Sequence, residues 1–405
     1  MEVYQLVVFG LLAWMTLGTM LNVWVFPTVR PARPGEPKRQ GSDVPRVSVL
    51  VPARNEERNI GTLVDSLQRQ DDPNFEVLVL DDRSDDQTVA ILEAKGFVDG
   101  AHDSSARFRY YRGQELPTGW TGKPWACTQL AAFARGQWLL FTDADTLHAP
   151  SAVRAAMESA QRLKAGLLSA WPRQIMGTWA ERWVIPLVYV LTHTLLPQAL
   201  VSLINARPTL ARRIGPKGLA ALGAANGQFM LFRRDVYERL GGHAAVRSHL
   251  VEDVALGRLV MASAATGDLL VNADGTHQVS CRMYHGVREV WEGFSKNLRP
   301  AFGTNLLAFV GSGVFQLALF VLPALFFVVG CLQPPGQILP GFPWIAGQVA
   351  LLGLIRLVLA WRFRTGWWVI LCHPLAYLLA LTIALNSWRW AMGGRIRWKG
   401  REYRA

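Results

Sequence analysis

Short apolar runs alternate with amphipathic stretches through the first third of the chain. Val47–Val51 is a buried-type apolar run, and it is followed by a turn and an amphipathic helix from about Asn59. A second strand is predicted at Phe75–Leu80, with a helix after it through Lys95, and a third lies in the stretch QWLLFTDADTLHAP. Apolar strands that alternate with helices are typical of a parallel sheet covered on both faces. The pattern therefore predicts an α/β fold.

Longer apolar runs lie outside this region. Val3–Phe26 has no charged residue and is long enough to cross a bilayer, and it lacks the basic start and cleavage site of a signal peptide. We therefore expect residues 1–29 to be a retained transmembrane anchor. Residues 301–390 are predicted to hold further transmembrane helices at Asn305–Gly330, Phe342–Trp361 and Gly366–Trp388. Arg356 and His373 interrupt the last two runs, and buried polar groups in such segments usually face other helices or a cavity.

One apolar run, Trp183–Ile204, is nearly long enough to span but contains two prolines and His193. A crossing here would place the acidic end of the third strand and the pair Glu252-Asp253 on opposite sides of the membrane. We therefore predict that residues 172–214 form an interfacial segment that lies along the bilayer.

The positions of the basic residues predict how the chain is oriented in the membrane. Residues 30–45 form a basic linker directly after the first span, which places the following domain in the cytoplasm by the positive-inside tendency. The expected location is thus the inner membrane, with several crossings. Three C-terminal crossings would leave the basic tail, residues 391–405, outside. Either one of these segments is re-entrant or the tail departs from the positive-inside rule, and we expect a cytoplasmic tail.

The amino-acid composition narrows the classes of partner and site that the chain can have. The chain has 405 residues, of which 51% are hydrophobic, with 16 Trp and a formal net charge of +12. That charge suits an anionic membrane surface, nucleic acid or an anionic substrate without choosing among them. The four cysteines are widely spaced without a CxxC pair, which argues against a zinc site or a disulfide framework.

Acidic residues follow two of the predicted strands. Asp143 and Asp145 come directly after the third strand, and Asp81 and Asp82 end the second. In such sheets ligands bind beyond the carboxyl ends of the strands. Two carboxylates there can hold a hard divalent cation that shares its other positions with substrate phosphates, although an acidic surface turn is the simpler alternative. Ser84, Asp85 and Asp86 are expected to cap the next helix.

Three other stretches carry candidate chemistry. Arg54 and Glu56 lie at the end of the first strand, with Asn55 between them, although a helix cap would explain Asn55 or Glu56 equally well. The pair Glu252-Asp253 lies in an apolar helix-like run, where it either faces water or supplies a catalytic base. Gly241–His243, just before it, indicates a tight turn near that site.

The stretch LPTGWTGKPWA contains a Gly-Lys pair but is not a nucleotide-binding P-loop, because Pro follows the Lys and Pro117 replaces the first Gly. Lys123 is predicted to meet a phosphate as a point charge, and Trp120 or Trp125 to cover a flat ligand face. For Trp125 a purely structural role is equally expected.

The blocks PARNEE, LDDRSDD, GWTGKPWA, TDADT and GGH followed by VEDVALG, in this order, resemble the family 2 glycosyltransferases of the GT-A fold. The likeness covers residues 46–300, and the flanking apolar runs resemble the membrane-bound branch that acts on lipids. CRMYHGVREVWEGFSKN and the terminal WKGREY are similar to the bacterial carotenoid glycosyltransferases of the diaponeurosporenoate and chlorobactene type, with the hopanoid-associated enzymes close by.

The resemblance implies a Rossmann-like nucleotide-diphospho-sugar domain and a role for each matching residue. It implies a UDP-sugar as the expected donor, Mg²⁺ or Mn²⁺ held by Asp145, and Asp253, next to Glu252, as the base of an inverting displacement. The residues implied to bind the nucleotide-sugar are Pro52, Arg54, Glu56, Asp81, Asp82, Lys123, Asp143 and Arg282. The implied acceptor is a hydroxyl or carboxyl group of a membrane lipid, and no nucleic acid is expected as a partner.

Alternatives remain open. Processive members carry Q-x-x-R-W after the base, whereas this chain has QVSCRMY, which argues against a polymer-forming synthase. A polyprenyl-phosphate sugar synthase would use an anionic acceptor and need no base, and hopanoid or sphingolipid-type acceptors also fit. A nucleotidyltransferase would need a Gly-rich loop after the first strand, which is absent. A non-catalytic membrane scaffold gives no reason for Asp143, Asp145 and Asp253 to occur together.

Overall fold

The computed structural model describes residues 2–31, 46–72, 74–302, 305–393, 395–398 and 401–404. Most of the predicted linker, residues 30–45, lies outside these ranges, as does part of the basic tail. The chain divides into two compact units. One, the helical unit, comprises residues 1–25, 176–198 and 284–405. The other, the sheet unit, comprises residues 26–175 and 199–283.

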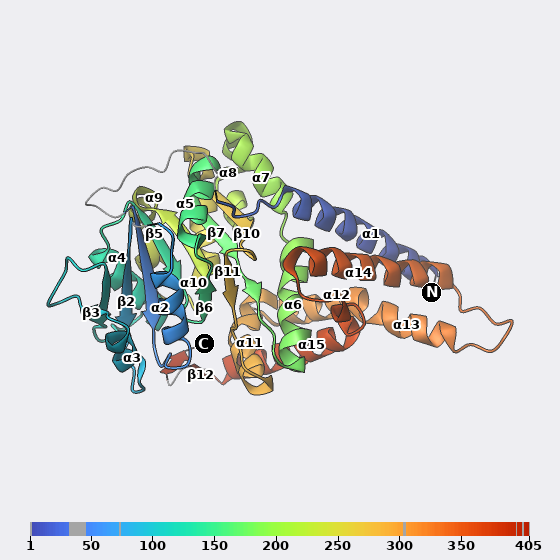
Figure 1. Ribbon diagram of the computed structural model, residues 1–405. Helices are drawn as coiled ribbons and strands as arrows, with labels where there is room; N and C mark the ends of the chain where they lie inside the picture. The colour runs from blue at the N-terminus through green and yellow to red at the C-terminus, as the bar shows by residue number, and fades with distance from the viewer. Residues whose placement is uncertain are drawn as a thin grey trace. The chain divides into compact units, whose positions relative to one another are not determined.

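The sheet unit is built on an eight-stranded sheet with the order β10-β7-β9-β5-β1-β2-β4-β3 (Figure 1). These strands are β1 Val47–Ala53, β2 Phe75–Asp81, β3 Val98–Asp99, β4 Phe108–Arg112, β5 Trp138–Thr142, β7 Ala165–Trp171, β9 Phe229–Arg233 and β10 Leu269–Asp274. A second, three-stranded sheet has the order β6-β11-β8 and consists of β6 Thr146–His148, β8 Arg173–Gln174 and β11 Val279–Cys281.

The strands predicted from the apolar runs are confirmed, but the sheet is mixed rather than parallel. β1 pairs in parallel with both β2 and β5, whereas β9 runs antiparallel to β5 and β7. The sequence of β9, FMLFR, is a continuous apolar run like those of its parallel neighbours. Its direction could not be seen in the pattern, because it depends on the connection that brings the chain back to the sheet.

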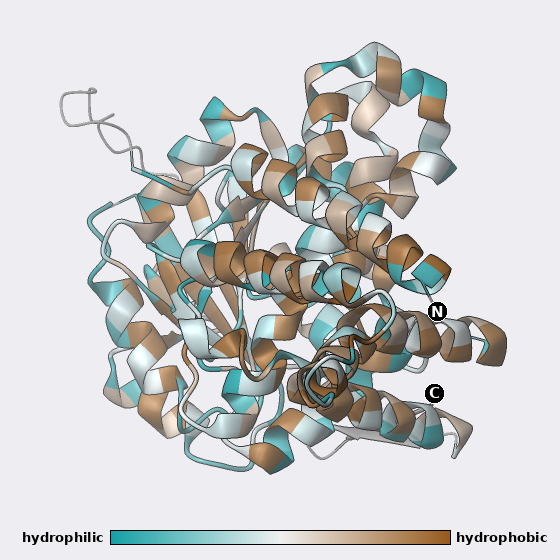
Figure 2. Cartoon of the chain, turned by 90° about the vertical axis from the view of Figure 1, so that its right-hand side faces the viewer, coloured by the Kyte–Doolittle hydropathy of each residue, from teal (hydrophilic) through white to brown (hydrophobic). Residues whose placement is uncertain are grey.

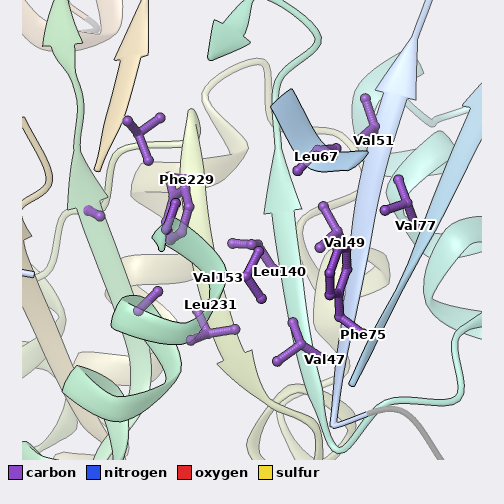
Figure 3. Packing of buried hydrophobic residues seen from close by; sticks show 14 of the residues in the cluster. Val47, Val49, Val51, Leu67, Phe75, Val77, Leu140, Val153, Phe229 and Leu231 are labelled. Atoms are coloured by element: carbon purple, nitrogen blue, oxygen red, sulfur yellow. The ribbon is translucent and has the colours of Figure 1, made fainter. Parts of the chain in front are cut away.

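Side chains of the central strands alternate between two apolar layers. Val47, Val49 and Val51 enter one layer, and Leu50 enters the other. The first layer, part of which Figure 3 shows, includes residues of α2 Ile60–Gln68, α3 Thr88–Ala94 and α5 Ala152–Arg162. The second includes residues of α4 Gly122–Phe133, α8 Pro208–Ala221 and α10 Glu252–Ala262. Both faces of the sheet are therefore covered, as the continuous apolar strands require.

The remaining elements of the sheet unit are short. They are α7 Gln198–Ala206, α9 Arg234–Arg239, and the 3₁₀ turns η1 Gly242–Val246 and η2 Ala264–Thr266. The segment that follows the first helix also joins this unit. The Val29 amide donates to the Asp274 carbonyl at 2.9 Å, and the Asp274 amide donates to the Pro27 carbonyl at 2.7 Å. Residues 27–29 therefore extend the sheet beside β10.

The helical unit contains the predicted apolar segments, and Figure 2 shows hydrophobic residues along the helices of the chain, mixed with polar ones. Its elements are α1 Glu2–Val25, α6 Trp179–Thr194, α11 Val287–Phe302, α12 Leu306–Phe320, α13 Leu322–Cys331, α14 Phe342–Phe363, η3 Trp367–Val369, α15 His373–Met392, β12 Arg395–Trp398 and β13 Arg401–Arg404. Buried amides join the helices: Gln348 donates to the Gln5 side chain, and Asn22 donates to the His193 carbonyl at 2.8 Å.

Among the residues that the structure describes, three helical segments are long and apolar enough to cross a membrane, namely Glu2–Val25, Leu306–Cys331 and Phe342–Phe363. The predicted fourth span, Gly366–Trp388, is not among them, since its helix begins only at His373 and ends in SWRWAM. α6 and α7 pass the same test only as a pair that is bent by 46°. The interfacial placement of residues 172–214, the domain boundaries and the side of each segment stay predictions.

Candidate active site

The carboxyl ends of β5, β1 and β2 lie side by side at one end of the main sheet. Ala53 pairs with Asp81, and Leu50 pairs with Phe141. If that second register is continued, Asp143 lies level with Pro52. The start of β9 is also here, since β9 is antiparallel to β5 and Thr142 pairs with Phe229. The predicted residues that follow these strands are therefore gathered at one edge by the pairing alone.

Lys123 is the centre of a charged cluster at this edge. Its Nζ lies 2.6 Å from Oδ1 of Asp143 and 3.0 Å from Oε1 of Glu252. It is the second residue of α4, so the Gly-Lys pair opens a helix instead of lying in a free turn. Burial opposes the charge of Lys123, but Asp143 and Glu252 outweigh burial and raise the pKa of the lysine well above its usual value. Lys123 is thus a firmly held cation between two acids.

Asp253 is oriented by the backbone on both of its oxygens. The Gly227 amide donates to Oδ2 at 2.7 Å, and the Val254 amide donates to Oδ1 at 2.8 Å. Burial, together with the neighbouring charge of Glu252, raises the pKa of Asp253 to about 6, while Lys123 acts in the opposite direction. A carboxyl group with this pKa is ionised at neutral pH and still basic enough to take up a proton.

Gly227 contributes to the site, and the sequence analysis did not identify it. A Cβ added at this position would lie 3.0 Å from Oδ2 of Asp253 and 3.2 Å from Nζ of Lys123. The position therefore needs a residue without a side chain, so that its amide can approach the carboxylate. Its signal in the sequence was the Asn-Gly pair directly before the apolar run of β9.

The loop before α10 is tied to the start of α4. Thr121 donates its amide to the Arg247 carbonyl at 2.8 Å, and its hydroxyl donates to the His249 carbonyl at 3.1 Å. This linkage places the helix that carries Lys123 beside the helix that begins with Glu252. Thr121 was not singled out in the sequence, because a helix N-cap would explain a threonine there without any long-range contact.

The GGH stretch forms the predicted tight turn. Gly241 and Gly242 have φ values of 79° and 50°, in the left-handed region that favours glycine. A Cβ on Gly242 would also lie 2.4 Å from the Tyr237 ring. The Tyr237 hydroxyl lies 2.9 Å from Nδ1 of His243, and burial lowers the pKa of His243 to about 3. His243 is therefore neutral, and it helps to hold the turn.

Asp143 and Asp145 lie on a turn, not on a continued strand. β5 ends at Thr142, and the Thr146 amide donates to the Asp143 carbonyl at 3.3 Å. Both carboxylates are half-buried. Across the small sheet Thr146 pairs with Cys281, and this pairing brings Arg282 next to Asp145, whose carbonyl accepts from the Arg282 amide at 3.4 Å.

Oδ1 of Asp143 meets the ammonium of Lys123, and the carboxylate of Asp145 lies beside the buried Cys281 thiol. Burial and the negative charge of Asp145 raise the pKa of the Cys281 thiol well above its usual value, so that its sulfur stays protonated. Within the described ranges no group of three or more His, Cys, Asp or Glu residues is arranged to hold a metal. A metal here would need further ligands from a substrate or water, as Mg²⁺ commonly does.

The remaining predicted residues lie around the ends of β1 and β2. Arg54 donates from Nη1 to the Asp82 carbonyl at 2.7 Å, and this bond links the two strand ends. Asp81 and Asp82 are both buried, and burial raises the pKa of Asp81. Oε2 of Glu56 accepts from the Asn59 side chain at 2.9 Å. These contacts fit a structured pocket wall and equally a local turn, so the ligand roles stay predictions.

The predicted cap of the helix after β2 is wrong, because the N-cap of α3 is Gln87, whose side chain makes no capping bond, and Asp86 lies one residue before it. Oδ1 of Asp86 accepts from the Thr88 amide at 3.0 Å, at the start of α3. Ser84 and Asp85 bond elsewhere: the Ser84 hydroxyl accepts from the Asn55 amide, and the Asp85 amide donates to the Asn55 side chain. These two bonds hold Asn55, whose backbone is left-handed with φ of 52°, against the turn that follows β2.

The aromatic residues near Lys123 pack on each other. The rings of Trp120 and Trp125 meet edge to face at 5.0 Å, and Nε1 of Trp125 donates to the Gln114 carbonyl at 3.4 Å. These contacts fit a structural role for Trp125, and its alternative role as a cover for a ligand stays a prediction.

Comparison with known proteins gives matches to both the domain and the whole chain. Residues 48–241 match the family Glycosyl transferase family 2. The chain is 27% identical over 371 residues to the 4,4'-diaponeurosporenoate glycosyltransferase of Staphylococcus aureus strain MRSA252, covering 88% of each protein. The enzyme of strain USA300 is 26% identical over 376 residues with the same coverage. Among solved structures, a mannosyltransferase from Pyrobaculum calidifontis in complex with GDP-Man and Mn²⁺ matches 95% of this chain and 99% of its own, with 19% identity and a TM-score of 0.47.

Proposed function

Residues 48–241 form a family 2 glycosyltransferase domain of the GT-A fold and the protein is a glycosyltransferase; from this premise we propose that it glycosylates a membrane lipid of the carotenoid class. One observation carries the acceptor: the likeness to the diaponeurosporenoate enzymes extends over 88% of both chains, so it includes helices outside the family 2 domain. The three membrane-length helices suit an acceptor that is dissolved in the bilayer.

The proposed donor is a nucleoside-diphosphate hexose, with UDP-glucose as the expected compound. Arg54, Asp81 and Asp82 lie at the carboxyl ends of β1 and β2, where a nucleotide binds in sheets of this kind. Lys123, a half-buried cation at the same end of the sheet, supports a diphosphate as the bound group. On donor binding, a phosphate oxygen would take over the ammonium from Asp143 or Glu252.

Asp253 is the proposed base of a single inverting displacement. The acceptor hydroxyl attacks the anomeric carbon while Asp253 removes its proton, and the nucleoside diphosphate leaves from the opposite face. Two backbone amides hold the carboxylate in place, and each oxygen keeps a second lone pair for the incoming proton. Glu252 supports this basicity, since its charge raises the pKa of Asp253.

We further propose that Asp145 holds Mg²⁺ or Mn²⁺ together with the donor diphosphate, with Arg282 nearby as a second cationic contact. The metal would neutralise the charge that develops on the leaving group.

The acceptor group decides how much the reaction needs Asp253. A carboxylic acid is already ionised at neutral pH, so it can attack without a base and gives a glycosyl ester. A hydroxyl group needs its proton removed and gives a glycoside. The relatives' name points to an acid, and the placement of Asp253 suits a hydroxyl, so both acceptors belong in the test.

The proposal is tested with membranes that contain the protein, labelled UDP-glucose and either a carotenoid acid or the matching carotenoid alcohol. We expect a lipid-soluble product whose mass increases by one hexosyl residue, with inverted anomeric configuration. Chelation by EDTA and the variant Asp145→Ala should each abolish formation of this product. Added Mn²⁺ or Mg²⁺ should restore it in the chelated wild type but not in Asp145→Ala.

Two results would contradict the proposal. One is transfer to polyprenyl phosphate with no transfer to either carotenoid, which would favour the polyprenyl-phosphate synthase. The other is full activity of Asp145→Ala in the presence of EDTA, which would remove the metal from the mechanism.

A further inference from the structure

The helices α7 and α8 of the sheet unit have a buried side and an exposed side (Figure 1). The buried sides pack on the second apolar layer, through Val201, Ile204, Ala211 and Leu219. The Asn205 side chain donates to the Leu270 carbonyl at 2.8 Å and ties α7 to β10. These contacts fix which side of the two helices faces outward.

Four cations lie on the exposed side, namely Arg207, Arg212, Arg213 and Lys217. Within the part of the chain that the structure describes, none of these four side chains forms an ion pair. No Asp or Glu occurs between residues 182 and 234, so α7 and α8 supply no carboxylate of their own. Unpaired like charges at one surface repel each other, and an anionic partner would remove this repulsion. We call these four residues the α8 basic surface.

Apolar side chains lie beside the α8 basic surface. Leu203 is 41% exposed, and Ala206, three residues later on the same side of α7, is exposed as well. Exposed leucine next to arginine and lysine is typical of helices that lie in the head-group region of a bilayer. Single-stranded nucleic acid is held by aromatic stacking as well as by cations, and residues 198–221 contain no Phe, Tyr or Trp. The composition therefore favours a membrane surface over nucleic acid.

The chain reaches the α8 basic surface directly from an apolar helix. Only Leu195–Pro197 separates α6 from α7, and the two helices together are apolar enough to cross a membrane but are bent by 46°. α8 follows after Arg207, which is its N-cap residue. The order along the chain is thus an apolar helix, a helix with an exposed leucine and then a basic helix. This order is expected where a chain passes from hydrocarbon to the head groups.

We propose that the α8 basic surface binds the phosphate groups of anionic phospholipids, with Leu203 at the boundary of their acyl chains. The cytoplasmic leaflet carries a negative surface potential, and each Lys or Arg close to it strengthens binding about fivefold. The proposal gives the predicted interfacial segment, residues 172–214, a lipid partner, and it extends the contact to Lys217. It does not depend on the sugar donor or on the acceptor.

The test measures contact between α7 and lipid head groups in the absence of both substrates. The full-length protein carries Cys331→Ser and Cys372→Ser, so that a fluorophore can be attached at Ser202→Cys on the exposed side of α7. Nanodiscs of phosphatidylcholine contain a lipid with a nitroxide on its head group, with or without about 30% phosphatidylglycerol. We expect phosphatidylglycerol to increase quenching of the fluorophore at least twofold. About 0.5 M NaCl should remove this increase, because salt screens exposed charges.

The combined variant Arg212→Gln, Arg213→Gln and Lys217→Gln should lose the increase in quenching that phosphatidylglycerol causes. Its quenching in phosphatidylcholine alone should equal that of the parent protein. The replaced side chains are exposed, so the midpoint of thermal unfolding should stay unchanged. If the variant does not fold, the salt dependence of the parent protein still tests the proposal.

A matched control removes the same charge from the opposite face of the sheet. It combines Arg69→Gln, Arg162→Gln and Lys164→Gln, three exposed positions at the ends of α2 and α5. These two helices pack in the first apolar layer, whereas α8 packs in the second. The control should keep the full response to phosphatidylglycerol.

Four results would overturn the proposal. Two of them are equal quenching with and without phosphatidylglycerol in the parent protein, and an unchanged response in the folded triple variant. The third is loss of quenching on addition of a single-stranded oligonucleotide, which would show that the surface binds nucleic acid. The fourth is loss of quenching with inorganic phosphate at constant ionic strength, which would show a site for free phosphate. Because the test involves no sugar transfer, its failure would leave the proposed function unaffected.

Discussion

At the scale of single residues, the site is defined by how one lysine and three carboxylates share charge. Lys123 contacts Asp143 and Glu252 directly, and Asp253 is held by two amides. The sequence identified all four residues, because each lies in a distinctive motif at a predicted strand or helix end. It could not show that Lys123 bridges the acids, since Asp143 and Glu252 are more than a hundred positions apart and their distances to Lys123 depend on the folded sheet.

The pH dependence of transfer should report Asp253. With a neutral alcohol as acceptor, kcat/KM should fall about tenfold per pH unit below pH 6, because protonation of Asp253 removes the base. Asp253→Asn should lose about 10²–10⁴-fold in rate and also lose this acidic limb. The measurement is a pH–rate profile between pH 5 and 8. A wild-type profile that is flat through this range would contradict the role of Asp253.

The Asp253 carboxyl group also makes the stability of the folded protein depend on pH. Its pKa is raised in the folded protein, so the folded state binds the proton more tightly than the unfolded chain does. Its contribution to stability is therefore greatest below about pH 4 and is lost as the pH rises toward 6.

Removal of Lys123 should shift the acidic limb of the pH–rate profile. Because the charge of Lys123 lowers the pKa of Asp253, Lys123→Met should shift the acidic limb of the profile to higher pH and should also raise KM for the donor. Lys95→Met is a matched control, since Lys95 pairs with Asp65 at 2.7 Å on the opposite face of the sheet from α4. An unchanged limb in Lys123→Met would show that the lysine does not influence the base.

At the scale of elements, the site depends on where helices and strands begin. The turn from β5 to β6, the start of α4, the start of α10 and the Asn-Gly step before β9 all meet at one end of the sheet. The sequence predicted β1, β2 and β5 from their continuous apolar runs. It missed the antiparallel direction of β9 and the contact of Gly227 with Asp253, because both depend on pairing between segments that are distant in the chain.

Gly227→Ala tests this convergence. The added methyl group would press on Asp253 and Lys123 at 3.0–3.2 Å, so we expect kcat to fall by at least tenfold with little change in the unfolding temperature. In the control Gly61→Ala the nearest contact is an ordinary 3.4 Å to Ile91, and activity should be unchanged. Equal activity of both variants, measured beside thermal unfolding, would show that the approach of the Gly227 amide is dispensable.

Glu181 organises the start of α6 in the helical unit. This buried carboxylate accepts from the Thr178 hydroxyl at 2.6 Å and from the amides of Gly177 and Gly286 at 2.7 and 2.8 Å. Glu181→Gln replaces one acceptor oxygen by a donor that faces an amide or a hydroxyl, and it should cost about 1–3 kcal/mol. A lower midpoint of thermal unfolding in detergent is the expected observation. Glu292→Gln, on the more exposed face of α11, should leave this midpoint within one or two degrees.

At the scale of the whole molecule, the three membrane-length helices allow a topology that would remove the conflict over the C-terminal tail. If Glu2–Val25, Leu306–Cys331 and Phe342–Phe363 cross the membrane and the sheet unit is cytoplasmic, as predicted, the basic tail is expected on the cytoplasmic side as well. The sequence predicted these three spans from their length. Gly366–Trp388 is not among the described helices that are long and apolar enough to cross, so a crossing by this segment stays a prediction.

Cys331 can test this topology without an engineered label. It is exposed at the end of α13, whereas Cys127 and Cys281 are buried and Cys372 is partly buried. We expect a membrane-impermeant maleimide to label Cys331 in intact spheroplasts, and the variant Cys331→Ser to lose this labelling. Labelling only after the membrane is opened would place Cys331 on the cytoplasmic side and refute the proposed orientation.

The strand-like segment at residues 27–29 has a consequence for the order of folding during synthesis. It pairs with Asp274 at the end of β10, so the segment leaves the ribosome long before its partner is made. By then α1 would already be inserted, and the edge of the sheet would close only after almost the entire sheet unit has been translated. Closure of this edge is thus a late co-translational step between distant parts of the chain, the kind that is slow to form and exposed to misfolding.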